Sequence, residues 1–292
     1  MAVKFFGQYL VEHKIITRMN LLQAIELQEK NNLRFGEMVI AMGLLSEEQA
    51  ATIHRAQRNQ DLQFGDMAVK LGLLNPDQVQ HVLNKQRSQH LFIGQALVAI
   101  GALTEEQLDR HLQVFKDEQQ SSLTEKITIP AGIPHRPIWE MVADLTYKML
   151  TRIAGLSFRP GPCVEVDKIP SRPVIVEVGL AGAVSARYLL TISENTRTLI
   201  ANAVLQEAPS THQAEPLAEP ILEFVKIVCG NMVNKAEQLG YAIDMTPPHL
   251  HALEQVDLKI PADQTAIQFP IYLSDGEIFE LIISVQKESV CS

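Results

Sequence analysis

The sequence lacks most of the features that mark redox, metal or membrane proteins. It has only three cysteines, Cys163, Cys229 and Cys291, and they form no CxxC pair. This excludes a disulfide framework and is typical of a reducing, cytoplasmic compartment. No apolar run reaches the ~18 residues of a membrane span, and the N-terminus lacks the apolar stretch of a signal peptide. The absence of a Gly-Lys-Ser/Thr sequence excludes a P-loop ATPase.

An excess of positive charge is also missing. The chain has 25 Lys and Arg against 34 Asp and Glu, a net charge of −9, and both halves are acidic. Nucleic acid is therefore not an expected partner, because domains that bind it present a basic surface. The length of 292 residues and the 46% hydrophobic content predict two domains, each with its own core.

A repeat occupies the first part of the chain. A motif that ends in glycine recurs every 29 residues, as Phe5-Phe6-Gly7, Arg34-Phe35-Gly36, Gln63-Phe64-Gly65 and Phe92-Ile93-Gly94. Other positions keep this spacing, namely Gly43, Gly72 and Gly101 (with Lys14 in the first copy), Thr17, Ser46, Asn75 and Thr104, and Gln28, Gln57 and Gln86 (with Phe115 in the fourth). We number the copies one to four, as residues 5–28, 34–57, 63–86 and 92–115. They predict a single structural array.

Each copy is predicted to form two helices. In copy two, residues 36–42 fit a short helix that Gly43 ends, because glycine adopts the left-handed conformation without steric cost. Ser46 and Gln49 form a capping box at the start of the second helix. A two-helix unit this short cannot bury its apolar face alone, so neighbouring copies are expected to stack. The result is an all-helical domain of about eight short helices, in residues 1–118.

The repeat resembles the N-terminal domain of the MshE/GspE-type ATPases of pilus assembly and type II secretion. In one branch of that family, two tandem motifs of 24 residues bind cyclic di-GMP. Residues 5–28 and 34–57, with the spacer 29–33, have this length and register. The resemblance implies a candidate nucleotide-binding or docking surface that comprises Phe5, Gly7, Gln28, Arg34, Phe35, Gly36, Gln57, Gln63 and Gly65.

The sequence departs from that family at the first residue of the motif, which is arginine in the family. Only copy two has an arginine there, Arg34, and the other copies have Phe5, Gln63 and Phe92 at this position. A guanidinium both stacks on a base and donates to phosphate, whereas phenylalanine donates nothing. Two alternatives stay open, a protein-docking module and a cyclic di-GMP sensor. A sensor would use copies one and two or copies two and three, because both pairs include Arg34.

The second half is predicted to be an α+β domain, residues 137–292, after a linker of residues 119–136. Residues 127–129 could add an edge strand. Helices are expected at 137–154, 194–205 and 215–239, and strands at 174–180, 186–192, 258–260, 266–273 and 277–285. Gly179 to Gly182 fits a turn between strands, and Ser274-Asp275-Gly276 fits a hairpin turn. The order predicts helices packed on a mostly antiparallel sheet.

This half resembles the CheX-type domain of the CheC/CheX/FliY chemotaxis phosphatases. The resemblance rests on Glu223-Phe-Val-Lys226, on Gly230-Asn231, and on the later Gly240 and Pro247-Pro248. In that family a Glu-x-x-Asn motif lies on one helix face. The glutamate docks a lysine of the phosphorylated response regulator, and the asparagine orients the attacking water. The resemblance also implies a homodimer that forms through exposed sheet elements.

The catalytic motif is altered in this sequence. Glu223 keeps the docking position, but Lys226 stands where the family has asparagine. An ammonium has three donors and no acceptor, so it cannot accept a hydrogen bond from the attacking water. Asn231 lies about 80° from Glu223 around an ideal helix and is not an obvious substitute. The helix at 137–154 offers Glu140 with Ala143, again without asparagine.

Neither metal nor cofactor is expected. His249 and His251 share a strand face near Asp244, but no third ligand is well placed. The sequence thus predicts a cytoplasmic signalling or adaptor protein that binds a receiver domain or a component of a secretion, pilus or chemotaxis system. Its CheX-like half is expected to lack phosphatase activity. The alternative is a response-regulator phosphatase that the first domain regulates.

Overall fold

The computed structural model describes residues 5–57, 60–119, 127, 129–206, 218–251 and 260–287. The chain divides near residue 123 into two compact units, and we describe each by itself. Within the described ranges, no helix is both long enough and apolar enough to span a bilayer.

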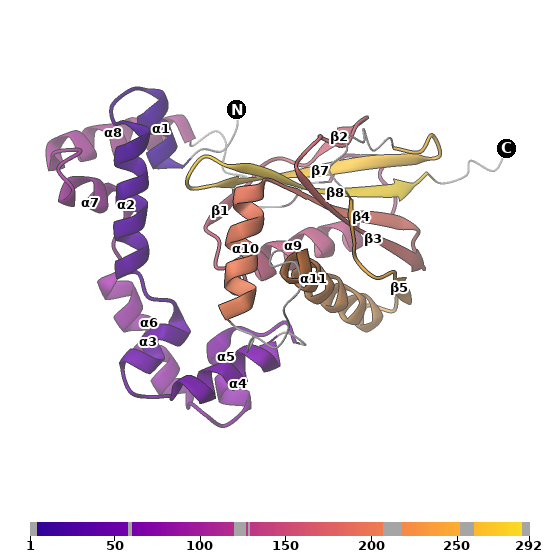
Figure 1. The fold of residues 1–292 in the computed structure, drawn as a ribbon, viewed down its shortest axis with the longest axis horizontal. Coiled ribbons are helices and arrows are strands. Elements are labelled where there is room, and N and C mark those ends of the chain that lie inside the picture. Colours follow the sequence, from indigo (N-terminus) through magenta and orange to yellow (C-terminus); the bar gives the residue numbers. More distant parts are fainter. Residues whose placement is uncertain are drawn as a thin grey trace. The chain divides into compact units, whose positions relative to one another are not determined.

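The first unit is helical throughout its regular structure (Figure 1). Its helices are α1 (Phe6–Glu12), α2 (Arg18–Asn31), α3 (Phe35–Ala41), α4 (Glu47–Gln57), α5 (Phe64–Lys70), α6 (Pro76–Gln89), α7 (Ile93–Ala99) and α8 (Glu105–Gln119). The predicted capping box at α4 is present: Gln49 N donates to Ser46 Oγ at 3.2 Å, and Ser46 N donates to Gln49 Oε1 at 2.9 Å. Gly43 has a φ of 69°, and Lys14, its equivalent in copy one, has 58°.

The copies pack as two pairs and not as one stack in sequence order, contrary to prediction. Copy one packs against copy four, through α1 and α2 with α7 and α8, and copy two packs against copy three, through α3 and α4 with α5 and α6. Each pair has its own apolar core. A tandem nucleotide motif would need a site shared by copies one and two. These two copies belong to different pairs, so such a site would not lie within either of the two apolar cores.

Helices α2 and α6 have 14 residues each, and three residues separate each of them from the next helix, α3 or α7. The described part of α4 ends at Gln57, and residues 58 and 59 fall outside the described residues.

The second unit is an antiparallel sheet with helices on one face (Figure 1). Its helices are α9 (Arg136–Arg152), α10 (Glu194–Gln206) and α11 (Ala218–Gln238). Its strands are β1 (Phe158–Pro160), β2 (Val164–Val166), β3 (Val174–Gly182), β4 (Ala186–Ile192), β5 (Ile243–Met245), β6 (His249–His251), β7 (Gln264–Leu273) and β8 (Ile278–Gln286). The order is β1-β7-β8-β4-β3-β5, with β2 paired to β7 and β6 paired to β3.

Most predicted elements of this unit are confirmed, with some corrections. The segment from Gly179 to Gly182 continues strand β3 and is not a turn. Four strands of three residues, β1, β2, β5 and β6, were not predicted, because so short a segment has no measurable periodicity. Ile127 and Ile129 lie outside any strand, and Ile260 does too, whereas residues 258–259 fall outside the described residues. Ile129 and Ile133, predicted to belong to a linker, are buried in this unit's core.

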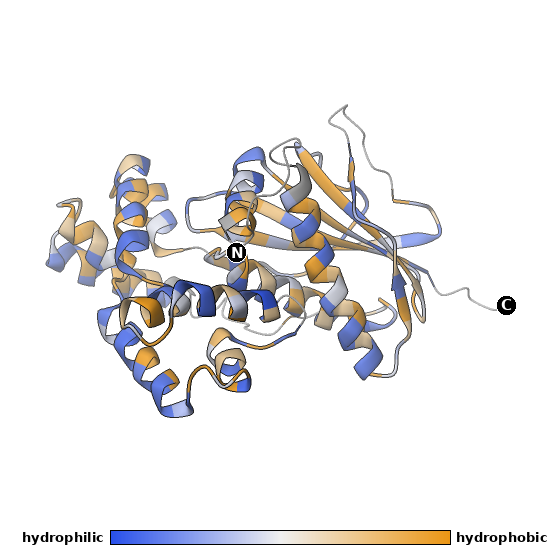
Figure 2. Cartoon of the chain, turned by 60° about the horizontal axis from the view of Figure 1, so that its bottom comes forward, coloured by the Kyte–Doolittle hydropathy of each residue, from blue (hydrophilic) through white to orange (hydrophobic). Residues whose placement is uncertain are grey.

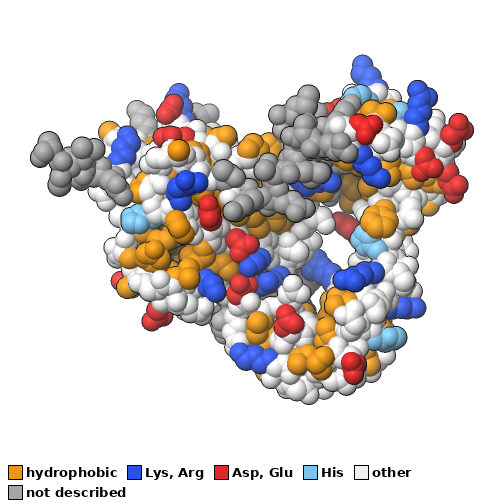
Figure 3. Space-filling view, turned by 180° about the vertical axis from the view of Figure 1, so that it is seen from behind, with side chains coloured by type: hydrophobic (Ala, Val, Ile, Leu, Met, Phe, Trp, Pro, Cys, Tyr) orange, Lys and Arg blue, Asp and Glu red, His pale blue; other side chains and the backbone are white. Residues whose placement is uncertain are grey.

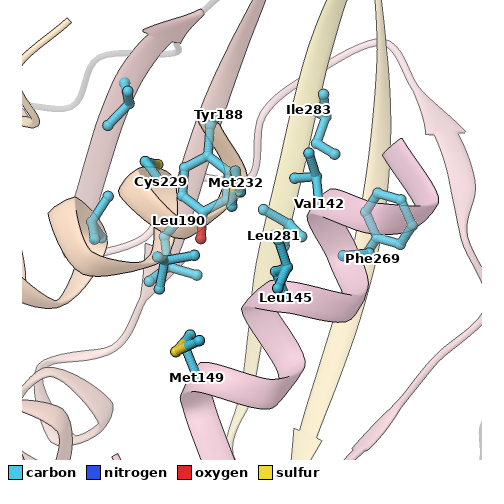
Figure 4. Packing of buried hydrophobic residues seen from close by; sticks show 14 of the residues in the cluster. Val142, Leu145, Met149, Tyr188, Leu190, Cys229, Met232, Phe269, Leu281 and Ile283 are labelled. Carbon is cyan, nitrogen blue, oxygen red and sulfur yellow. The ribbon is translucent and has the colours of Figure 1, made fainter. Parts of the chain in front are cut away.

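The main core lies between the sheet and the helices. Alternate residues of β3, among them Val176 and Val178, face α9 and α11, and Figure 4 shows Leu145, Tyr188 and Cys229 in the same layer. The other sheet face buries a second cluster, which comprises Ile169, Ile175, Leu189, Ala266 and Ile282. Because both faces are covered, the central strands are almost continuously apolar, and they appear orange in Figure 2.

Candidate functional site on helix α11

Helix α11 carries Glu223, Lys226 and Asn231, the candidate docking and catalytic residues predicted from the sequence. Its buried side contains Ile221, Phe224, Val225 and Val228, which pack into the main core. This burial fixes the rotation of the helix, and it turns Glu223 and Lys226 outwards. The two side chains are three residues apart and therefore neighbours on the helix surface.

Glu223 and Lys226 form a loose ion pair. Lys226 Nζ lies 3.9 Å from Glu223 Oε2, and the two side chains are 65% and 44% exposed, respectively. An exposed pair at this distance contributes only a few tenths of a kcal/mol, since water screens both charges. Both groups are therefore accessible to a partner.

Asn231 is placed differently. It is only 5% exposed, and its Nδ2 donates to the carbonyl oxygen of Ile227 at 2.9 Å. Its amide thus takes part in the helix's own packing, on a side away from Glu223. On α9, Glu140 is half-buried and Ala143 is fully buried. Neither helix presents an asparagine amide beside an exposed glutamate at these motif positions.

A second polar group, not predicted from the sequence, lies on the other face of the sheet. Arg187 on β4 donates two hydrogen bonds to Glu177 on β3, at 2.6 and 2.8 Å, and His251 Nε2 lies 2.7 Å from Glu177 Oε2. The Arg187 guanidinium and His251 lower the pKa of the Glu177 carboxyl, against the opposing effect of burial. Of the two histidines, His251 is thus part of an ion-pair network, and no group of three metal-binding side chains occurs among the described residues.

The cysteines offer no activated thiol where they are described. Burial raises the pKa of Cys163 to about 12 and raises that of Cys229 further. A thiol with a raised pKa is a poor nucleophile and metal ligand. Cys291 lies outside the described residues.

The glycines of the repeat motif serve the packing of the helices. A Cβ added at Gly7 or Gly94 would overlap the Cδ1 of Leu21 or Leu108, respectively, and one at Gly65 would lie 2.9 Å from Val79 Cγ1. These partners are equivalent residues of the second helix in each copy. At Gly36 the corresponding space is filled by Phe64 and His54. Gly7, Gly36 and Gly65 are buried, so they do not form an open ligand surface.

The motif glutamines are also used inside the unit. Gln28 Nε2 donates to the carbonyl oxygen of Leu91, and Gln57 Nε2 donates to that of Leu62, both at 2.9 Å. Phe115, at the same position in copy four, packs on Phe6 with 5.3 Å between ring centroids.

The other residues of the predicted nucleotide-binding or docking surface lie at the starts of helices. Arg34 and Gln63 are exposed at the N-caps of α3 and α5. Phe35 is half-buried against Phe64, and Phe5 is half-buried at the N-cap of α1. The Arg34 backbone N–H donates to Glu37 at 2.8 Å, and Arg34 is exposed. On the face in Figure 3, charges of both signs are interspersed.

Comparison with known proteins concerns the second unit. Residues 174–272, from β3 into β7, match the model of the chemotaxis phosphatase CheX family. The CheY-P phosphatase CheX of Thermotoga maritima is 23% identical over 142 residues, which are 48% of this chain and 90% of that protein.

Similar solved structures include a chemotaxis protein CheX from Desulfovibrio desulfuricans, with 14% identity, a TM-score of 0.45, and coverage of 51% of this chain and 99% of that one. The CheX–CheY–BeF3–Mg2+ complex from Borrelia burgdorferi has 25% identity, a TM-score of 0.40, and coverage of 51% and 97%. By its sequence match, the second unit of this chain is similar to the CheX family, and we call it the CheX-like unit.

Proposed function

We propose that the CheX-like unit binds the receiver domain of a response regulator and does not hydrolyse its aspartyl phosphate. The observation that carries this proposal is the exposed pair on α11, with Glu223 at the docking position and Lys226 at the place of the family's asparagine. Docking needs an accessible carboxylate, which is present. Hydrolysis needs a group that accepts a hydrogen bond from water, and lysine has none.

Lys226 also suits a phosphorylated partner. An ammonium is a common ligand of phosphate oxygens, and here it is exposed and only loosely paired. Binding is therefore expected to be stronger when the receiver domain is phosphorylated. The relative named CheY-P phosphatase supports this class of partner. It also supports the rival function, a response-regulator phosphatase.

The test of binding is a titration with a purified CheY-type receiver domain of the same organism, with and without beryllium fluoride and Mg2+ as a phosphate mimic. The proposal predicts saturable binding that the mimic strengthens and that Glu223→Ala weakens. Absence of binding in both states would contradict it.

For the first unit we propose a protein-docking role, which makes the whole chain an adaptor. The motif glycines and glutamines act within the unit, and the exposed candidates are Arg34 and Gln63. Cyclic di-GMP is the alternative ligand. A titration with labelled cyclic di-GMP up to tens of micromolar distinguishes the two, since saturable binding lost in Arg34→Ala would favour the sensor.

The homodimer is a further proposal, supported by the resemblance of the second unit to CheX-type domains. Light scattering of the full chain tests it. A mass of twice 32.5 kDa is expected, and a monomer at micromolar concentration would contradict it.

A further inference from the structure

A glycine stands in the interior of α11. Gly230 is the thirteenth of the 21 residues from Ala218 to Gln238. Its φ angle is not positive, so any residue can adopt its backbone conformation. Glycine in a helix interior is less favourable than alanine, because it loses more backbone freedom on folding. Helix formation therefore gives no reason for this residue.

Packing within the described residues gives no reason either. A Cβ added at Gly230 would meet no described atom within 4 Å. The contrast is with Gly7 and Gly94, where the same added atom would overlap a leucine of the neighbouring helix. A methyl group at position 230 would thus fit the folded unit and would stabilise its helix.

Gly230 lies on the same face as the proposed docking residues. It follows Glu223 by seven positions and Lys226 by four. On an ideal helix it is about 20° from Glu223, between the directions of the two side chains. It is half-exposed. This face of α11 therefore presents the Glu223 carboxylate, the Lys226 ammonium and, one helical turn after Lys226, backbone without a side chain at Gly230.

We propose that Gly230 keeps this stretch of α11 bare so that the receiver domain packs directly on the helix backbone beside Glu223 and Lys226. This inference rests on the proposed function. It identifies Gly230 as the position at which the receiver domain comes closest to α11. A protein surface that pairs with both charges must come close to the helix, and a side chain at position 230 would hold it away. The family match spans this helix, and the relative named CheY-P phosphatase gives the class of the occupant, a receiver domain.

The experiment measures stability and receiver binding in the same variants of the full chain. Gly230→Ala is expected to raise the melting midpoint of the CheX-like unit by about 2–4 °C, read from the fluorescence of its single tryptophan, Trp139. The same change is expected to weaken binding of the beryllofluoride-activated receiver by about fivefold or more, as overpacking does. Gly230→Leu is expected to weaken it further. Asn202→Ala, at an exposed position of α10, is the control, since it also favours a helix and should leave binding unchanged.

The outcomes separate this inference from the proposed function. If the native chain binds the receiver and both Gly230 variants bind equally well, the inference is wrong and the proposed function stands. If the native chain does not bind at all, both are wrong. If Gly230→Leu instead abolishes self-association and spares receiver binding, the bare face serves a second copy of the chain and the inference is overturned.

Discussion

Gln28 Nε2 donates a hydrogen bond to the carbonyl oxygen of Leu91, which lies 63 residues further along the chain. Gln86 makes the reciprocal bond to Leu33 at 2.9 Å. Gln57, the equivalent residue of copy two, bonds instead to Leu62, five residues away. In copy two the glutamine thus bonds to the connection that follows its own helix. In copies one and three the equivalent glutamine bonds to the connection that follows the other copy. Each of these two bonds lies within one pair of copies: Gln28 joins copy one to the segment before copy four, and Gln86 joins copy three to the segment before copy two.

Removal of Gln86 is expected to loosen the copy-two/copy-three pair. Gln86→Ala leaves the part-buried carbonyl of Leu33 without its side-chain donor, at a cost of about 1 kcal/mol. Hydrogen exchange of the segments 28–33 and 86–91 should become faster. Gln80→Ala, on the same helix and bonded only to the exposed Asn84 in the described structure, is the matched control and should leave those rates unchanged.

The repeat glycines give a second prediction. In Gly94→Ala the added methyl overlaps Leu108, so the first unit should lose about 1–3 kcal/mol of unfolding free energy. Denaturant unfolding followed by far-UV circular dichroism measures this loss. The double variant with Leu108→Ala should recover part of the loss, because it removes the clashing atom. A double variant whose loss equals the sum of the two single losses would argue against the overlap.

The sequence predicted the local structure of the repeat better than its packing. Capping boxes and glycine stops depend on neighbours in the chain, so Ser46 and Gly43 were placed correctly. Which copies pair depends on contacts between segments far apart in the sequence, and no residue type marks those contacts. In the second unit the long strands were predicted, while the short strands β5 and β6 depend on pairing with β3 and were missed.

The network at Glu177 predicts a pH-dependent stability. Because Arg187 lowers the pKa of Glu177 in the folded protein, this carboxylate stabilises the fold above its unfolded pKa of about 4.5. That contribution is lost as pH falls through the lower, folded value. Glu177→Gln should therefore cost about 1–3 kcal/mol near pH 7, and the difference from the native chain should shrink below about pH 4.5.

Urea unfolding of the CheX-like unit, followed by the fluorescence of the buried Trp139, measures this at several pH values. Glu237→Gln is a suitable control, since Glu237 is exposed. An equal loss of stability at pH 3 and pH 7 would show that the ionised carboxylate does not act as described.

Lys226 gives a gain-of-function prediction. Lys226→Asn restores the family's amide three residues after Glu223, where it can orient the attacking water. Since this catalysis is mostly positioning, release of phosphate from a phosphorylated receiver should rise by roughly tenfold or more over the native chain. Lys235→Asn removes the same charge further along α11 and should have no effect. Equal rates for the native chain and Lys226→Asn would mean that more than one residue was altered.

The candidate site on α11 was predicted in part. The spacing of Glu223 and Lys226 was readable, because residues three apart share a helix face. That Asn231 is buried depends on the rotation of α11, which the apolar residues of this helix fix only in the folded unit. The bare backbone at Gly230 could not be inferred, since a glycine in a sequence does not reveal whether its space is filled.

Phosphate release from a phosphorylated CheY-type receiver domain, measured with and without the full chain, distinguishes binding from hydrolysis. We predict that the chain binds the receiver and leaves the rate of release unchanged or lowers it, because Lys226 cannot position water. A faster release that Glu223→Ala abolishes would instead identify the chain as a phosphatase.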